Sequence, residues 1–177
     1  PLNCSGWGVD VVVTASQKAL EVPPGLGLIA LCSERAVEAF NEVSGSVRGY
    51  YSRLSSWAKV MEAYERGEVA YYATPATHLV VALAKSLEKI LAEGLERRFR
   101  RHAVLARALR RGLRAMGLEI VARREEIAAN TVTAVYTPEN VSPVEIRKAM
   151  IAGNITVAMP IHPALRGRSI RIGHMGA

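Results

Sequence analysis

One lysine, Lys18, follows Ser16 and Gln17 at a point where the chain passes between two apolar segments. The runs 9–13 and 26–31 are rich in valine, leucine and isoleucine, and we expect two strands that are buried on both faces. An ammonium close to such a core is costly unless it is paired or loses its proton. Desolvation therefore favours a neutral Lys18 amine, which can condense with an aldehyde. The alternative is a lysine whose stem lies on the sheet rim while its ammonium reaches water.

A second candidate is Arg171, which stands between Ile170 and Ile172 in a run that we expect to form a strand. Side chains alternate between the two faces of a strand, so the guanidinium points to the opposite face from its apolar neighbours. A guanidinium can bind a carboxylate through two hydrogen bonds, which a lysine cannot do. A structural salt bridge is the alternative role for Arg171.

Tyr71 and Thr74 belong to a Tyr-x-x-Thr-Pro pattern. A threonine hydroxyl can cap the first amides of a helix, and Pro75 suits the first helical position, so we expect a helix to start here. Apolar residues recur at three- and four-residue steps over 79–91, which predicts one buried face that ends at Gly94. Taken alone, Tyr71 is a half-buried aromatic residue and Thr74 is a helix cap.

Three blocks of the sequence together resemble the class V aminotransferases of the alanine-glyoxylate and serine-pyruvate group. They are Ser-Gln-Lys-Ala-Leu at 16–20 with Pro-Pro-Gly-Leu at 23–26, Tyr-Tyr-Ala-Thr-Pro at 71–75, and Arg-Ile-Gly-His-Met-Gly at 171–176. Related desulfurases carry a histidine directly before the lysine, and Gln17 argues against that branch. The resemblance implies an α/β fold, the fold type I architecture of pyridoxal-phosphate-dependent transferases, represented by its later portion.

The same resemblance implies pyridoxal 5'-phosphate as the cofactor and Lys18 as the residue that forms a Schiff base with it. Once a substrate has displaced Lys18, the freed amine would move a proton between the substrate Cα and the cofactor. The resemblance also assigns the Gln17 amide and the Ser16 hydroxyl to the cofactor phosphate. Without it, Gln17 is a solvent-facing residue at a strand end and Ser16 is a turn residue.

The remaining two blocks imply a dimer and a substrate site. Tyr71 and Thr74 match family positions that reach across an interface to the neighbouring subunit's phosphate, so a homodimer is expected. Arg171 matches the residue that binds the substrate carboxylate. The implied enzyme is a transaminase that moves an amino group from alanine or serine to glyoxylate or pyruvate in a ping-pong cycle.

The resemblance covers only the later part of such an enzyme. We expect residues 1–93 to be the end of the large cofactor-binding domain and residues 94–177 to be the small C-terminal domain without its last helix. The family's glycine-containing phosphate loop is absent from the chain. Asp10, its only aspartate, does not fall at the position that pairs with the pyridine nitrogen. Whether a separate chain supplies the first half, and whether this chain is active alone, stay open.

The sequence predicts further elements in both parts. A short helix is expected over 33–43. Beyond Gly94 we expect a compact α/β layer. Residues 95–117 have leucines at helical spacing among many arginines, which predicts an amphipathic helix with a solvated basic face that ends at Gly117. A capped helix is expected over 142–152, and the expected strands are 118–121, 131–136, 155–158 and 169–172.

The composition limits the functional classes. Half of the 177 residues are hydrophobic, which indicates a globular protein, and no apolar run approaches the ~20 residues of a membrane span. The first residues lack a signal-peptide pattern, so a cytoplasmic location is expected. Neither the two cysteines nor the four histidines have metal-ligand spacing, and no metal is expected.

The charge of +7 is concentrated between Arg97 and Arg114, which suggests an anionic partner. A basic helical module for nucleic acid is one alternative function, although the leucines suit a docked helix and we expect no nucleic-acid partner. A different class V fold type I enzyme that acts on a small amino acid is a second possibility. A third is a noncatalytic remnant that dimerises or binds a partner.

Overall fold

The computed structural model describes residues 2–43 and 46–176. They form two compact units that divide between Leu87 and Glu88, and each unit is described by itself. The division falls earlier in the chain than Gly94, the boundary expected from the sequence. The assignment of the two parts to a large and a small domain stays a prediction. In the described part of the chain, no helix is both long enough and apolar enough to cross a membrane.

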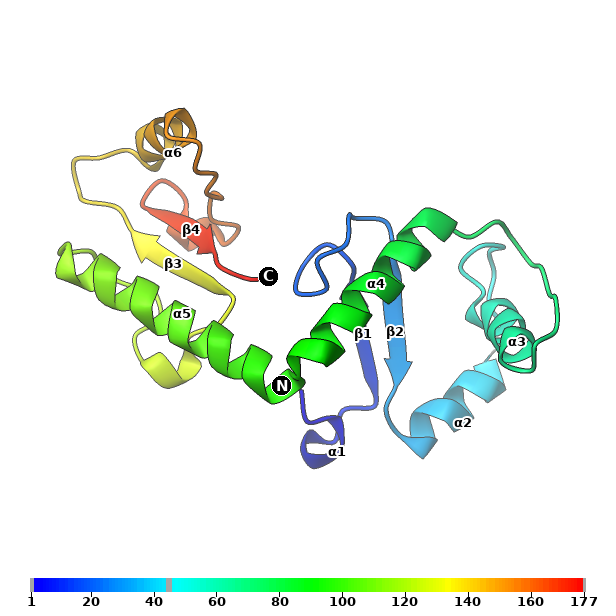
Figure 1. Cartoon of the computed structure of the whole chain (residues 1–177). Coiled ribbons are helices and arrows are strands. Elements are labelled where there is room, and N and C mark those ends of the chain that lie inside the picture. The colour runs from blue at the N-terminus through cyan, green and yellow to red at the C-terminus, as the bar shows by residue number, and fades with distance from the viewer. Residues whose placement is uncertain (1, 44–45, 177) are drawn as a thin grey trace. The chain divides into compact units, whose positions relative to one another are not determined.

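The first unit contains a hairpin of two antiparallel strands, β1 (Val11–Ala15) and β2 (Gly27–Leu31) (Figure 1). β2 occurs where the sequence predicts it, whereas β1 overlaps the predicted run 9–13 but begins at Val11 and continues to Ala15. The expectation that they are buried on both faces is wrong for this chain, because Val13 and Ile29, which pair across the hairpin, are 69% and 45% exposed. Among the described residues this sheet has two strands, which cannot shield both faces.

The helices of the first unit are α1 (Cys4–Trp7), α2 (Glu34–Val43), α3 (Leu54–Glu65) and the first part of α4 (Thr77–Glu93). Helix α2 was expected, and the Ser33 hydroxyl caps it by accepting a hydrogen bond from the Ala36 amide at 3.1 Å. Neither α1 nor α3 was predicted from the sequence. For α3 the signal exists, because Leu54, Trp57 and Met61 recur at helical spacing.

The start of α4 corrects a prediction. The helix begins at Thr77, not at Thr74 and Pro75. The Thr74 hydroxyl instead lies 2.8 Å from the Tyr71 hydroxyl, and the Pro75 carbonyl accepts from the Thr77 amide at 2.8 Å. Thr74 therefore belongs to the segment that leads into the helix, and its hydroxyl pairs with Tyr71.

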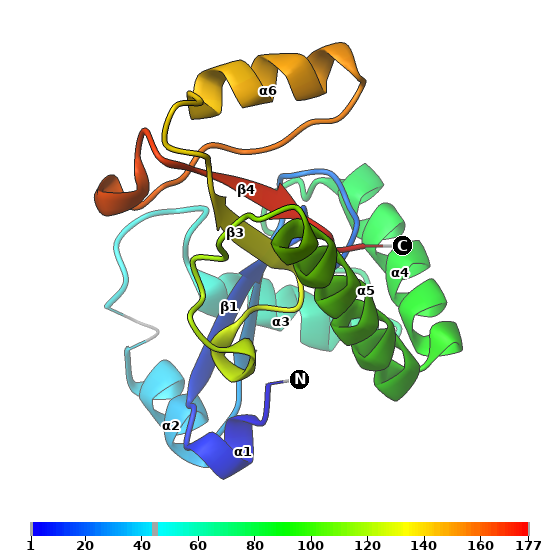
Figure 2. The ribbon, with the colours of Figure 1, turned by 90° about the vertical axis from the view of Figure 1, so that its left-hand side faces the viewer.

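The second unit is an α/β layer, as predicted. After the long helix α5 (Leu95–Ala115), its elements are a 3₁₀ turn η1 (Glu125–Ile127), β3 (Val132–Tyr136), α6 (Pro143–Ala152), a second 3₁₀ turn η2 (Pro163–Leu165) and β4 (Ser169–Gly173). β3 and β4 pair antiparallel, and Figure 2 shows α6 beside β4. The start of α6 is the predicted capping box: the Ser142 hydroxyl accepts from the Val144 amide at 3.2 Å, and the Glu145 carboxylate accepts from the Ser142 amide at 3.3 Å.

The core of the second unit is built around this hairpin. Its buried members are Ile120, Val135, Val157 and Ile170, and side chains of α5 and α6 pack against them. The predicted strands at 118–121 and 155–158 are wrong: in the described residues each contributes a single isolated bridge, Ile120 to Val135 and Ala158 to Arg171. These short apolar runs therefore contribute side chains to the core but do not add strands to the sheet.

The arginine-rich helix α5 ends where it was predicted to end. Its arginines do not all lie on the solvated face, however. Gly117 has a φ of 80°, and the Leu118 amide donates to the Leu113 carbonyl at 3.0 Å, which is the hydrogen bond of a left-handed helix cap. Arg98 and Arg110 are buried, at 7% and 1% exposure. Two of the arginines therefore form part of the interior of the second unit.

Candidate functional site

Lys18 lies in the loop that joins β1 to β2. The Ser16 amide donates to the Leu26 carbonyl at 3.2 Å and closes the base of this loop. Within the loop, the Val22 amide donates to the Ser16 carbonyl at 3.2 Å, and the Glu21 amide donates to the Lys18 carbonyl at 3.0 Å. The backbone on both sides of Lys18 is therefore fixed by hydrogen bonds.

The Ser16 side chain forms hydrogen bonds within the loop. The residue is fully buried, its hydroxyl donates to the Pro23 carbonyl at 2.7 Å, and the same oxygen accepts from the Leu26 amide at 3.3 Å. Each bond satisfies a backbone group of a segment without regular structure, which is costly to leave unpaired. The geometry gives Ser16 a structural role and leaves the phosphate contact suggested by the sequence a prediction.

Helix α4 holds the same loop from outside. The Ser86 hydroxyl, on a residue that is 8% exposed, donates to the Leu20 carbonyl. Leu79, near the start of the helix, packs against Gly25: a Cβ on Gly25 would lie 2.5 Å from Leu79 Cδ1. Gly25 also has a φ of 140°, so glycine satisfies both a steric and a backbone requirement here.

The side chains of Gln17 and Lys18 are exposed, in contrast to these anchors. Among residues 2–43 and 46–176, no group forms a hydrogen bond or ion pair with either side chain. The expectation that Lys18 is withdrawn from solvent by its own chain is therefore wrong. Within the part of the chain that the structure describes, Lys18 is thus an exposed amine without a side-chain partner, on a backbone that hydrogen bonds hold in place.

Tyr71 and Thr74 place two hydroxyls side by side. Their oxygens lie 2.8 Å apart and share a hydrogen bond, and Tyr71 is 74% exposed. Two hydroxyls at this spacing can both donate to one oxyanion, after exchanging their mutual bond for bonds to the ligand. The geometry fits the phosphate role that the sequence suggests for this pair.

A tyrosine clasp, defined as Tyr50 and Tyr72, holds the segment that presents these hydroxyls. The two rings stack with centroids 4.6 Å apart. The Tyr50 hydroxyl donates to the Tyr72 carbonyl at 2.7 Å, and the Tyr72 hydroxyl donates to the Tyr50 carbonyl. Trp57 of α3 packs edge-on against Tyr72 at 5.6 Å. The reciprocal bonds fix the backbone next to Tyr71, and no local sequence signal indicates this pairing.

Arg171 lies on β4 in the second unit, whereas Lys18, Tyr71 and Thr74 belong to the first. Its Nε donates to the Met159 carbonyl at 2.9 Å, which orients the guanidinium. Within the described residues Arg171 forms no ion pair, so the structural salt bridge considered from the sequence is not formed there. The two terminal nitrogens of this half-buried side chain remain for a carboxylate.

The carboxylate of Asp10 is bound by side chains of its own unit. Its carboxylate accepts from the Ser33 hydroxyl at 2.6 Å and from the Arg35 guanidinium, whose Nε lies 3.3 Å away. The hydrogen bonds from Arg35 and Ser33 lower the pKa of Asp10. The only aspartate in the chain therefore ties the start of β1 to α2, which the sequence did not reveal.

A polar cluster in the second unit joins α5 to the last described residues. Glu93 accepts from Arg101 Nε at 2.7 Å and from Arg98 at 2.9 Å, and these bonds lower the pKa of Glu93 to about 2. Arg101 also donates to the Gly176 carbonyl at 2.9 Å. Burial lowers the pKa of His174, whose Nε2 lies 2.9 Å from the Thr133 hydroxyl. The cluster fixes the chain that follows Arg171.

Comparison with known proteins gives a consistent set of relatives. No protein-family model matches the chain. It is 38% identical over 174 residues to alanine–glyoxylate aminotransferase 1 of Saccharomyces cerevisiae, covering 96% of this chain and 44% of the yeast protein. It is 37% identical over 171 residues to serine–glyoxylate aminotransferase of Arabidopsis thaliana, covering 96% of this chain and 41% of the plant protein.

A solved structure agrees with these relatives. The crystal structure of ureidoglycine–glyoxylate aminotransferase from Bacillus subtilis superposes with a TM-score of 0.85 at 31% identity, covering 99% of this chain and 44% of that one. The chain therefore spans less than half the length of the relatives it matches.

Proposed function

The chain belongs to the class V aminotransferases of the alanine–glyoxylate and serine–glyoxylate type, and we therefore propose that Lys18 is the cofactor-binding amine of an enzyme that transfers an amino group from alanine or serine to glyoxylate or pyruvate. Its α/β fold matches part of the fold type I aminotransferase structures. The observation that carries the proposal is the unpaired Lys18 amine, within the described residues, on a loop anchored by Ser16 and Ser86.

The described residues fit two groups of pyridoxal phosphate, its aldehyde and its phosphate. Lys18 has no competing partner within the described ranges, so its nitrogen is available for a carbonyl carbon. The paired hydroxyls of Tyr71 and Thr74 suit a phosphate oxygen. Asp10 does not fit the pyridine nitrogen, because Ser33 and Arg35 already bind its carboxylate. When bound, the cofactor supplies the electron sink for amino transfer.

Lys18 would then move a proton. Its amine, once free of the cofactor, can accept a proton from the substrate Cα and donate that proton to the cofactor. A general base must stay within hydrogen-bond reach of the carbon it serves. The hydrogen bonds of the loop to Ser16, Leu26 and Ser86 restrict the backbone of Lys18 and so support this requirement.

The phosphate role proposed for Tyr71 and Thr74 implies a homodimer. We propose that Tyr71 and Thr74 bind the phosphate in the site of a second copy, and that Gln17 donates its amide to the phosphate from the same chain as Lys18. Tyr71 is 74% exposed, so its hydroxyl is accessible to a group on another molecule.

Arg171 is proposed to bind the substrate carboxylate. The Met159 carbonyl fixes its Nε, and the terminal nitrogens can then donate two parallel hydrogen bonds to a carboxylate. A 2-oxo acid and an α-amino acid share that carboxylate, so one arginine can serve both halves of a ping-pong cycle.

The choice of amino donor is a separate part of the proposal. The names of three relatives contain alanine, serine and ureidoglycine, and each name also contains glyoxylate. We propose a small amino acid as donor and glyoxylate or pyruvate as acceptor. This chain spans less than half the length of these relatives, and we propose that a separate N-terminal half supplies the rest of the substrate pocket.

Titration with pyridoxal phosphate tests the proposal. We expect a visible absorption band that is absent from Lys18→Ala, and that alanine or serine bleaches while glyoxylate restores it. Lys59→Ala is the matched control, because Lys59 is an exposed helix lysine in the same unit. A band of equal size in Lys18→Ala, or one that Lys59→Ala removes, contradicts the role of Lys18.

A further inference from the structure

Only some of the arginines on helix α5 form ion pairs that stabilise the second unit. Arg98 and Arg101 bind Glu93, and the buried Arg110 binds Glu125 through both Nε and a terminal nitrogen. Arg110 also donates to the Ala129 carbonyl at 3.0 Å. These arginines have structural roles, and the proposed transfer reaction uses none of the rest on the helix.

Three of the five remaining arginines lie on one face near the end of α5. Arg107, Arg111 and Arg114 follow one another at four- and three-residue steps, which places them side by side on a helix surface, and all three are exposed. Like charges at this spacing destabilise a helix. Glu125 offsets part of this repulsion at Arg114, and a bound anion would reduce it further.

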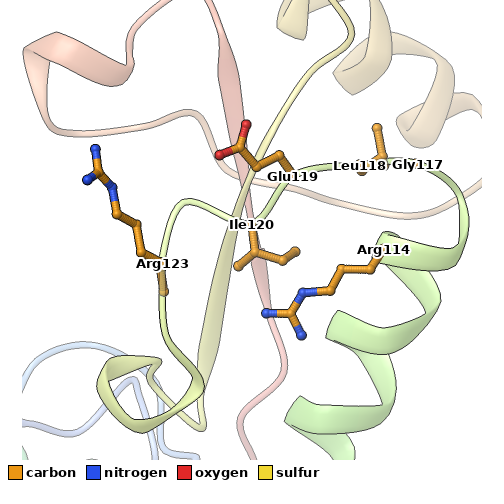
Figure 3. A pocket seen from close by; sticks show the side chains of 7 residues that line it. Arg114, Gly117, Leu118, Glu119, Ile120 and Arg123 are labelled. Atoms are coloured by element: carbon orange, nitrogen blue, oxygen red, sulfur yellow. The ribbon is translucent and has the colours of Figure 1, made fainter.

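Two neighbouring cavities open at this face. The larger has a volume of about 570 Å³ and is lined by arginine, glutamate and aliphatic side chains (Figure 3): Arg114, Arg123, Glu119, Leu118, Ile120 and Ala122. In Figure 3, Arg114 and Arg123 flank Ile120 on opposite sides. The smaller cavity, of about 190 Å³, is lined by Arg107, Arg111, Arg114 and Glu125, so Arg114 is shared.

The guanidinium donors at these cavities are largely unused. Among the described residues, Arg107, Arg111 and Arg123 have no ion-pair or hydrogen-bond partner for their side chains. Arg114 lies 3.5 Å from Glu125, whose carboxylate is held by the buried Arg110. The hydrogen bond from Arg110 lowers the pKa of Glu125, so this carboxylate stays ionised and committed to its partner. The described residues that line the cavities thus include four arginines and two glutamates. Of the two carboxylates, only that of Glu119 is not ion-paired with an arginine.

We propose that the two cavities of the second unit form a binding site for a small organic phosphate, built from residues that the proposed transfer reaction does not use. Guanidinium groups bind phosphate oxygens in a two-pronged geometry, and a volume of this size suits a small molecule. The aliphatic wall of Leu118, Ile120 and Ala122 would contact the organic part. The ligand carries at least two negative charges, because the site presents cations on both sides.

The lining favours a small ligand over a nucleic-acid strand. Proteins that hold single strands combine a basic groove with aromatic side chains on which bases stack. Among the described residues that line the two cavities, none is aromatic.

Calorimetric titration with inorganic pyrophosphate and with ADP tests the site. Both are titrated into the wild-type chain and into Lys18→Ala, so that the result is independent of the proposed cofactor lysine. We expect one saturable site in both proteins, with ADP bound at least as tightly as pyrophosphate. Arg114→Gln and Arg123→Gln should each weaken binding by about tenfold or more, since each removes charge-assisted hydrogen bonds.

Arg97→Gln is the matched control, because Arg97 is an exposed arginine of the same helix that lines neither cavity. It should bind as the wild type does, and thermal unfolding should show that all variants are folded. Absence of saturable binding, or equal weakening by Arg97→Gln, overturns the site. Displacement of ADP by a single-stranded oligonucleotide at a lower concentration than by pyrophosphate overturns it in favour of a nucleic-acid surface.

Discussion

The hydroxyl of Ser86, on helix α4, donates a hydrogen bond to the backbone carbonyl of Leu20 in the loop that carries Lys18. The two residues are far apart in the sequence, and their bond couples the position of the loop to the helix. Together with the bonds of Ser16, it fixes the backbone on both sides of the candidate catalytic lysine.

Replacing Ser86 by alanine should therefore loosen the loop. We expect a loss of unfolding free energy of about 1 kcal/mol or more, because the Leu20 carbonyl loses its partner in a part-buried position. Urea unfolding measures the loss. Lys89→Ala, an exposed change on the same helix, is the control and should be close to neutral. Equal stability of Ser86→Ala and Lys89→Ala would mean that the bond contributes nothing.

Gly25 should not tolerate a side chain. Its φ of 140° disfavours any other residue, and a Cβ would meet Leu79 Cδ1 at 2.5 Å. We expect Gly25→Ala to destabilise the first unit by more than about 1 kcal/mol in thermal or urea unfolding. Gly27→Ala is the comparison, since a Cβ there meets nothing within 4 Å and the φ is ordinary. If both variants unfold alike, the close approach of Leu79 is not a constraint.

The tyrosine clasp of Tyr50 and Tyr72 should support the hydroxyl pair of Tyr71 and Thr74. Tyr72→Phe keeps the ring stack but removes the hydrogen bond to the Tyr50 carbonyl, and we expect a stability loss of about 1 kcal/mol. The measurement is urea unfolding followed by tryptophan fluorescence, because Trp57 packs against Tyr72.

Tyr64→Phe is the control for this substitution. Tyr64 is 58% exposed, and among the described residues its hydroxyl has no partner. It should leave both stability and the fluorescence change unaltered. The clasp is refuted if Tyr72→Phe behaves in the same way.

The stability of the second unit should fall in acid through Glu93. Its bonds to Arg101 and Arg98 lower its pKa from 4.5 to about 2 in the folded chain. A carboxyl with a lowered folded pKa stabilises the protein above its unfolded pKa and loses that contribution as pH falls through the folded value. We therefore expect the difference in unfolding free energy between the wild type and Glu93→Gln to be constant above about pH 5 and to shrink between about pH 4.5 and pH 2.

Glu139→Gln checks that this effect belongs to Glu93. Glu139 is an exposed loop glutamate of the same unit. Its variant should follow the pH dependence of the wild type in denaturant titrations at each pH. A Glu93→Gln curve that stays parallel to the wild type down to about pH 2 would show that the ion pairs do not contribute to stability.

Local patterns predicted most of the regular structure. The apolar periodicity over 79–91 predicts α4, and the serine and glutamate of the capping box predict α6. Two short β-branched and aliphatic runs predict the strands β1 and β2, although their antiparallel pairing was not predicted. These signals lie within a few residues of the element that they specify.

The features that were not predicted depend on contacts between distant residues. A phosphate contact was suggested for Ser16 and no partner was predicted for Asp10, whereas the structure pairs Ser16 with backbone groups and Asp10 with Ser33 and Arg35. Burial of Lys18 was expected from its apolar surroundings. Its exposure shows that flanking strands cannot withdraw a side chain from water unless other segments cover the loop, and the chain spans less than half of its relatives' length.

The most direct test of the cofactor role is to find which lysine reacts. The protein is incubated with pyridoxal phosphate, reduced with borohydride, digested and mapped by mass spectrometry. We predict that Lys18 carries the label at cofactor concentrations at which Lys59 and Lys89, both exposed helix lysines, remain unlabelled. Labelling of Lys18 at the same level as Lys59 and Lys89 would contradict its assignment as the cofactor lysine.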